Sequence, residues 1–140
     1  MTLYSDIYDL YSGMVSDWEI LSLPEQDQDE ILEGWLLTAI GTFRTCKTDL
    51  SDRDSITKQF NLVLADTEKV ILAKLMIVEW LSPKLYNLEL LRNNLNSKDF
   101  TMYSPASFLK EMRSTQEGAR SIANRLITTY GYASIDVSKL

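Results

Sequence analysis

The sequence predicts an all-α protein, a compact helical bundle of about five helices with extended loops and a short strand-like C-terminal arm. Only five glycines and three prolines occur in 140 residues, which favours long helices over many short strands. The length favours a single domain with a sizeable hydrophobic core. We expect a helical body over residues 24–130, preceded by an N-terminal helix and linker over 1–23 and followed by an extended arm over 131–140.

Two helices are predicted in the first third of the chain. Residues 3–18 carry apolar side chains at spacings of three and four, which is the period of a helix. These side chains belong to Leu3, Ile7, Leu10, Tyr11, Met14, Val15 and Trp18. A second helix begins at Pro24, with Ser22 as its cap and Glu25 completing a capping box, and its apolar face continues to Phe43.

The stretch Asp66–Leu95 is predicted to contain the central helix. Over Val70–Leu81, large apolar side chains face almost every direction, and a helix that is apolar nearly all round is buried on most sides. Ser82-Pro83 then interrupts the helix, because proline lacks an N–H and clashes with the preceding turn. We therefore expect a separate helix to begin at Pro83 and to end near the close of this stretch.

The last helix is predicted to begin at Ser104-Pro105 and to end at Gly131. In the tail that follows, apolar Ile135 and Val137 alternate with polar neighbours, as in an added edge strand or a docking arm.

Two polar connections, residues 48–65 and 96–104, join the predicted helices. The first contains FNLVL, which is consistent with either a short strand or an extended segment. A connection of this length is unusual in a helical bundle, and long loops often carry function or partner contacts.

Charge is distributed unevenly along the chain, whose net charge is −6. Residues 1–33 carry nine acids and no base, whereas the remainder carries eleven acids and fourteen bases, a net charge of +3. Two interpretations remain open. The acidic front and the basic back suit head-to-tail contact with copies of the chain or with an unlike partner, or the acids form a solvated face that keeps the protein soluble.

The composition argues against most enzyme chemistry. Histidine is absent, which excludes histidine-dependent triads and His-based zinc sites. Cys46 is the single cysteine, so an internal disulfide is excluded, and we interpret it as a small buried hydrophobe. The glycines are scattered and form no phosphate-binding loop. The acids Asp27, Asp29, Glu30 and Glu33 fit a solvated helix start better than a glycosidase pair.

Asp49, Asp52 and Asp54 are the best metal candidates, because three carboxylates within six residues supply the hard oxygen ligands that calcium and magnesium prefer. Their spacing does not match an EF-hand loop. The neighbouring Arg53 and Lys58 favour turn hydrogen bonds and ion pairs instead. We therefore predict a non-enzyme with no cofactor, no metal and no catalytic residue.

Neither nucleic acid nor a membrane is expected as a direct partner. The isoelectric point is about 4.6, and the bases Lys110, Arg113, Arg120 and Arg125 spread around the last helix without forming a stripe. We expect no signal peptide, and the longest apolar run is too short to span a bilayer. These features favour a protein made in a cytoplasm.

Three segments resemble a group of small structural proteins of long-tailed bacteriophages that infect Gram-positive bacteria. They are EILEGWLLTAIGTFRTCKTDLSDRD, FNLVLADTEKVILAKLMIVEWLSPKLYNLELL and LNSKDFTMYSPASFLKEMR, within residues 30–130. This group comprises head–tail connector proteins, also called adaptor or head-completion proteins. The resemblance is a pattern across the helical body and contains no signature motif.

The resemblance implies a ring subunit of the virion neck, in a homo-oligomer that is usually twelvefold. Such a ring docks beneath the portal protein, extends the DNA channel without binding a specific DNA sequence and receives the next neck or tail component. The alternatives are a stopper-like neck or tail-completion protein and a cytoplasmic helical protein-binding module. The expected interface residues lie in the two connections and the tail: Asp49, Asp52, Arg53, Phe100, Tyr103, Tyr132, Ile135 and Val137.

Overall fold

The computed structural model describes residues 1–15, 22–94 and 105–133, and it confirms that the protein is mostly helical. Within these residues lie four helices and a small three-stranded sheet. The helices are α1 (Tyr4–Met14), α3 (Glu25–Thr42), α4 (Asp66–Asn94) and α6 (Pro105–Ala133), and the strands are β1 (Thr2–Leu3), β2 (Arg53–Asp54) and β3 (Gln59–Phe60).

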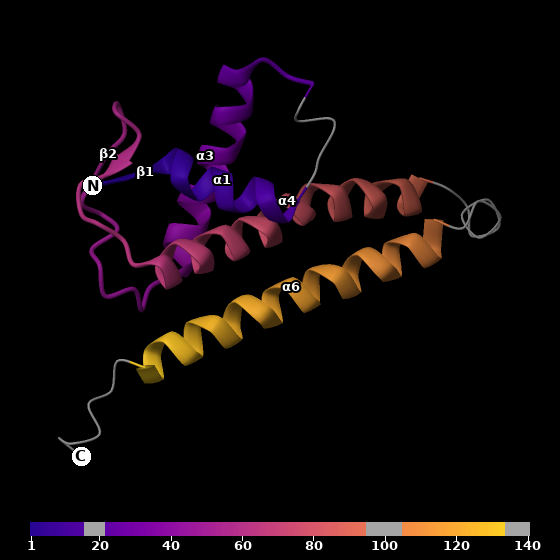
Figure 1. Ribbon diagram of the computed structural model, residues 1–140. Coiled ribbons are helices and arrows are strands. Elements are labelled where there is room, and N and C mark those ends of the chain that lie inside the picture. The colour runs from indigo at the N-terminus through magenta and orange to yellow at the C-terminus, as the bar shows by residue number, and fades with distance from the viewer. Residues whose placement is uncertain (16–21, 95–104, 134–140) are drawn as a thin grey trace.

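Helix α4 is central, as the sequence predicts. It packs against α6, α3 and α1. In Figure 1, α6 runs along one side of α4 for most of its length, while α1 and α3 lie on the other side over its first half. The apolar run of α4 contributes the largest share of the main hydrophobic cluster, through Ile71, Leu72, Ala73, Leu75 and Met76.

The prediction of a break at Ser82-Pro83 is wrong, because α4 continues through Pro83 to Asn94. The described residues therefore form four helices, where the sequence predicted about five. Hydrogen bonds hold the turn before the proline. The Val78 carbonyl accepts from Ser82 Oγ at 3.2 Å and from Gln116 Nε2 at 3.3 Å, and Gln116 Nε2 also donates to Ser82 Oγ at 2.9 Å. Gln116 lies on α6, so the neighbouring helix supports the turn that a proline weakens.

The first helix begins one residue later than predicted, because Thr2 and Leu3 form β1. Thr2 pairs with Phe60 in an antiparallel register, and β3 pairs on its other side with β2. Asp6 accepts a hydrogen bond from the Leu3 N–H at 3.1 Å at the start of α1. The FNLVL segment thus begins as a strand, and the long connection is tied to the N-terminus. The helix ends at Met14, and residues 16–18 of the prediction lie outside the described residues.

Two further boundaries differ from the sequence-based expectation. Pro24, and not Ser22, stands at the N-cap position of α3, and it makes no side-chain capping bond. Helix α6 passes through Gly131 to Ala133, because Gly131 does not adopt the left-handed conformation that ends helices. The first three residues of the predicted arm are therefore helical, and residues 134–140 lie outside the described residues. None of the described helices is long and apolar enough to cross a membrane.

Candidate functional site

The three aspartates of the first connection stabilise turns. Asp49 accepts from the backbone N–H of Ser51 at 3.0 Å, and Asp54 accepts from the N–H of Ile56 at 2.8 Å. The hydroxyl of Ser51 and the N–H of Ile56 make the largest contributions to lowering the pKa values of Asp49 and Asp54, respectively. Asp52 accepts from the Asn61 side chain at 2.8 Å. No group of three potential metal-binding side chains occurs in the part of the chain that the structure describes.

The basic residues near these aspartates are also engaged within the subunit. Arg53 donates to the Leu50 carbonyl at 2.9 Å. Lys58 pairs across the fold with Glu33 on α3 at 2.8 Å and adopts a positive φ of 55°. Tyr132 is exposed (69%) near the end of α6. The other proposed interface residues, Phe100, Tyr103, Ile135 and Val137, lie outside the described residues.

The densest polar cluster of the described residues surrounds Glu68, a carboxylate that is only 3% exposed. Its Oε2 accepts from Tyr130 Oη at 2.6 Å and from Cys46 Sγ at 3.1 Å. Its Oε1 accepts from Thr48 Oγ1 and from the Ala65 N–H, both at 2.8 Å. This Glu68 network joins the loop after α3, the start of α4 and the end of α6.

Electrostatics favours the charged form of Glu68. Burial alone raises the pKa of a carboxyl group, but the donated hydrogen bonds, led by that of Tyr130, outweigh it and hold the pKa of Glu68 at about 2. Burial raises the pKa of the Cys46 thiol to about 12, and the hydrogen bond to Glu68 adds to the effect. Burial and the bond to Glu68 likewise raise the pKa of Tyr130. Proton donors thus surround one fixed negative charge.

Cys46 differs in part from its interpretation as a buried hydrophobe. Its side chain is half-buried, and it donates a hydrogen bond to Glu68. A thiol with a raised pKa is a poor nucleophile, because the thiolate is the reactive form.

The sequence-based interpretation missed both Glu68 and Gln116 as structural residues. Glu68 stands three residues after Ala65, which is the spacing of the returning bond in a capping box. Gln116 is a polar residue at a core position between Met112 and Ala119 on the apolar stripe of α6. Both signals are visible in the sequence, but neither identifies the distant partner.

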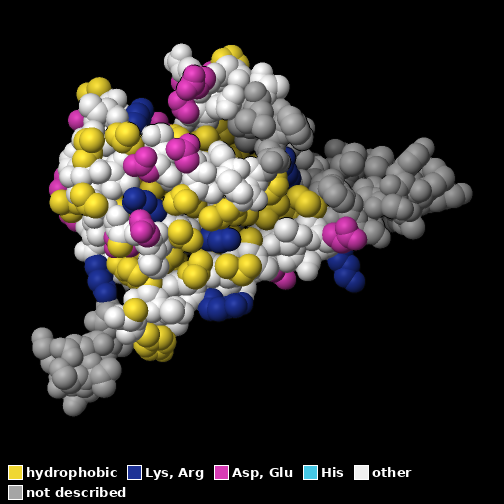
Figure 2. Space-filling view, viewed as in Figure 1, with side chains coloured by type: hydrophobic (Ala, Val, Ile, Leu, Met, Phe, Trp, Pro, Cys, Tyr) yellow, Lys and Arg dark blue, Asp and Glu magenta, His cyan; other side chains and the backbone are white. Residues whose placement is uncertain are grey.

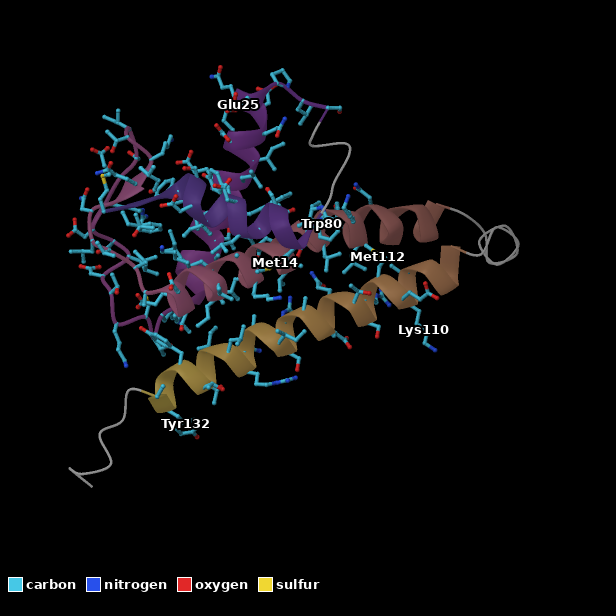
Figure 3. The ribbon with its side chains drawn as sticks, viewed as in Figure 1. Met14, Glu25, Trp80, Lys110, Met112 and Tyr132 are labelled. Carbon is cyan, nitrogen blue, oxygen red and sulfur yellow. The ribbon has the colours of Figure 1, made fainter. Side chains whose placement is uncertain are left out.

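A cleft of about 750 Å³ opens between α1, α3 and the turn at Thr57-Lys58. The charged side chains of its wall are four acids and Lys58, which pairs with one of them, Glu33. The acids are Glu25, Asp29, Glu30 and Glu33. Tyr4 and Tyr8 of α1 also line the cleft. Figure 3 shows Glu25 at the outer end of α3, on the opposite side of the molecule from Lys110 and Tyr132 of α6.

The four bases of α6, Lys110, Arg113, Arg120 and Arg125, are all exposed, and so are its two acids, Glu111 and Glu117. Arg113 and Arg120 lie seven residues apart and line a shallow groove with Tyr86 of α4. In Figure 2, acidic side chains gather over the start of α3 and basic side chains line the edge formed by α6. Acidic and basic side chains are mixed over the rest of this view, so the charge of the subunit is separated in part, with acids at the start of α3 and an excess of bases on α6.

Comparison with known proteins yields no match: no protein-family model, no curated protein and no solved structure is similar to this chain.

Proposed function

We propose that this protein is a non-enzymatic structural subunit of a bacteriophage virion neck, a head–tail connector that assembles as a ring beneath the portal protein. In this role it extends the DNA channel and joins the capsid to the tail. The sequence resemblance over residues 30–130 supports the proposal. The arrangement of charge on the folded subunit is the structural observation that favours it.

The structural argument rests on two unlike faces. Acids gather at the start of α3, whereas α6 carries four exposed bases against two exposed acids, Glu111 and Glu117 (Figure 2). A closed ring needs heterologous contacts, in which one face of a subunit meets a different face of the next. Opposite charges on opposite sides favour such contacts over a symmetric dimer, which would bring like faces together.

The mechanical requirements of a ring subunit also fit the fold. A ring that holds a DNA channel open must resist deformation, and the central α4 packs against three other helices. The Glu68 network fixes the end of α6 to the body by hydrogen bonds to a buried charge. An acidic protein that surrounds DNA without neutralising its phosphates holds it weakly, which suits a conduit.

Co-expression with neighbouring genes tests the proposal. The full chain is produced with the proteins encoded beside it, and the particles are examined by cryo-electron microscopy. We expect the chain in a ring beneath a portal. A ring one position further from the portal would indicate the stopper-like alternative, and a stable complex with a partner that is not a virion protein would indicate a helical binding module and refute the proposal.

A further inference from the structure

The outer face of α6 has no covering element among the described residues. The helix packs chiefly against α4, and its exposed charged side chains are four bases and two acids, a net charge of +2. Figure 3 shows the side chains of Lys110 and Tyr132 pointing away from α4. Ile122 (43% exposed) and Tyr132 (69%) add apolar surface to this face. Gly118 also belongs to it, and a Cβ added there would meet nothing within 4 Å.

The cleft between α1 and α3 has the complementary chemistry. Asp29 and Glu30 are exposed at its edge. Tyr4 contributes to its wall, and the Tyr4 hydroxyl is buried without a hydrogen-bond partner in the described part of the chain.

We propose that the acid-lined cleft between α1 and α3 receives basic side chains from the outer face of α6 of a second copy of this chain. The carboxylates accept hydrogen bonds from the incoming cation, and the tyrosine rings of the cleft supply apolar surface for its stem. This inference rests on the proposed function, since it names the faces through which ring subunits meet.

The placement of the two surfaces determines the kind of assembly. Helices α1 and α3, which line the cleft, lie on the opposite side of α4 from α6 (Figure 1), so each copy donates α6 to one neighbour and accepts α6 from another. Such a contact is heterologous and produces a ring or an open helical filament. A dimer in which both copies use the same surface would bring carboxylates against carboxylates.

Charge reversal on each surface tests this contact. One variant of the full chain carries Asp29→Lys and Glu30→Lys in the cleft, and another carries Lys110→Glu and Arg125→Glu on α6. None of these side chains makes a hydrogen bond or ion pair that defines the fold of the described residues. Asp9→Lys with Asp27→Lys is the matched control for the first variant, because neither aspartate lines the cleft. Lys110→Arg with Arg125→Lys, which keeps the charge, is the control for the second.

Self-association is measured by analytical ultracentrifugation at low salt, after circular dichroism has shown that each variant is folded. We expect each reversed variant alone to associate at least about tenfold more weakly than the wild type, whereas both controls associate normally. An equimolar mixture of the two reversed variants should recover association, because each cleft then meets an α6 of opposite charge. Reversed variants that associate like the wild type, or a mixture that fails to recover, would overturn the inference.

The outcomes separate this inference from the proposed function. A wild-type chain that stays monomeric at low salt refutes contact between copies, yet the chain can still be found in virion necks. A neck ring whose subunits meet through other surfaces refutes the inference alone. Recovery in the mixture together with absence from virions retains the contact and refutes the neck function. If the α6 reversal abolishes binding to a short DNA duplex and leaves self-association intact, the bases face DNA and the inference is wrong.

Discussion

The two ends of the α4–α6 pair are built differently. At the start of α4, helices α1 and α3 pack onto it, and seventeen buried residues form the main hydrophobic cluster of the described chain. Toward the far end, the second cluster consists of Leu85 and Leu109 with Met112 packed against them. The Glu68 network also lies at the near end, where it joins three segments of the chain.

The α4–α6 pair therefore belongs to the main hydrophobic core at its near end and extends beyond that core at its far end. The near end is held by contacts between segments far apart in sequence, whereas at the far end the described residues make only the contact between α4 and α6. Local stability follows the density of buried apolar contacts. We therefore expect amide protection to fall along α4 from Ile71 toward Leu85, and the following substitutions probe that gradient.

The largest loss of stability is expected from Glu68→Gln. This change replaces one carboxylate oxygen with an amide N–H₂ that faces the hydrogen-bond donors around it. Because the folded pKa of Glu68 is about 2 and its ordinary value is 4.5, the carboxylate contributes about 3 kcal/mol above pH 4.5, and this contribution is lost as the pH falls toward 2. The variant should lose most of this stability at pH 7 and show a flatter acid dependence in urea unfolding. The exposed control Glu117→Gln should change stability by less than about 0.5 kcal/mol. Parallel acid profiles for variant and wild type would contradict the assignment.

The next largest effect compares the two clusters directly. Leu36→Ala removes a side chain that is 0% exposed in the main cluster, and Leu109→Ala removes one that is 2% exposed in the second. We expect losses of about 3–4 kcal/mol for Leu36 and about 2 kcal/mol for Leu109, because a site between only two helices relaxes more readily around a cavity. Equal losses in chemical denaturation would show that the far end is as firmly packed as the core.

A smaller effect is expected at the junction of the two regions. Gln116→Ala removes the donor to the Val78 carbonyl and to Ser82 Oγ, and should lower stability by about 1–2 kcal/mol. Hydrogen exchange should quicken in α4 beyond Pro83 more than near Ile71. Gln26→Ala, at an exposed position of α3, is the control with the same chemical change. Uniform acceleration along α4 would mean that Gln116 does not support the proline turn.

The smallest expected effect is a gain in stability instead of a loss. Gly34→Ala on α3 and Gly118→Ala on α6 should each stabilise the protein by about 0.5–1 kcal/mol, because a Cβ at either position meets nothing within 4 Å and alanine restricts the unfolded chain. Thermal unfolding of the dilute, monomeric protein measures the change. Similar gains at both ends are expected, since neither glycine contacts the core. A loss at either position would reveal a contact that the subunit structure lacks.

The sequence was sufficient for features that depend on local periodicity. The burial of Ile71 and its neighbours in α4 follows from a run of large apolar side chains, and the start of α6 at Pro105 follows from a preference of proline for first turns. The path of α4 through Pro83 could not be predicted, because the support comes from Gln116, thirty-eight residues away from Val78. A rule based on local sequence considers the helix-breaking tendency of Pro83 and cannot include the hydrogen bonds from Gln116 on another helix.

The candidate interaction surfaces could likewise be predicted only in part from the sequence. The acid count of residues 1–33 anticipated an acidic face, and the bases of α6 were recognised as scattered around the helix. The cleft, however, is assembled from α1, α3 and the turn at Lys58, so its shape depends on tertiary packing. The same holds for Glu68, whose partners Thr48 and Tyr130 lie twenty and sixty-two residues away.

Tyr130 fastens the C-terminal end of α6 to the body of the protein, because it donates to Glu68 and accepts from the Lys47 N–H. Gln116 attaches the 29-residue helix to α4 a second time, and the second hydrophobic cluster holds it nearer its start. A neighbour that pulls on the outer face of α6 would therefore load three separate attachments, and part of the force would reach the buried carboxylate of Glu68 through Tyr130.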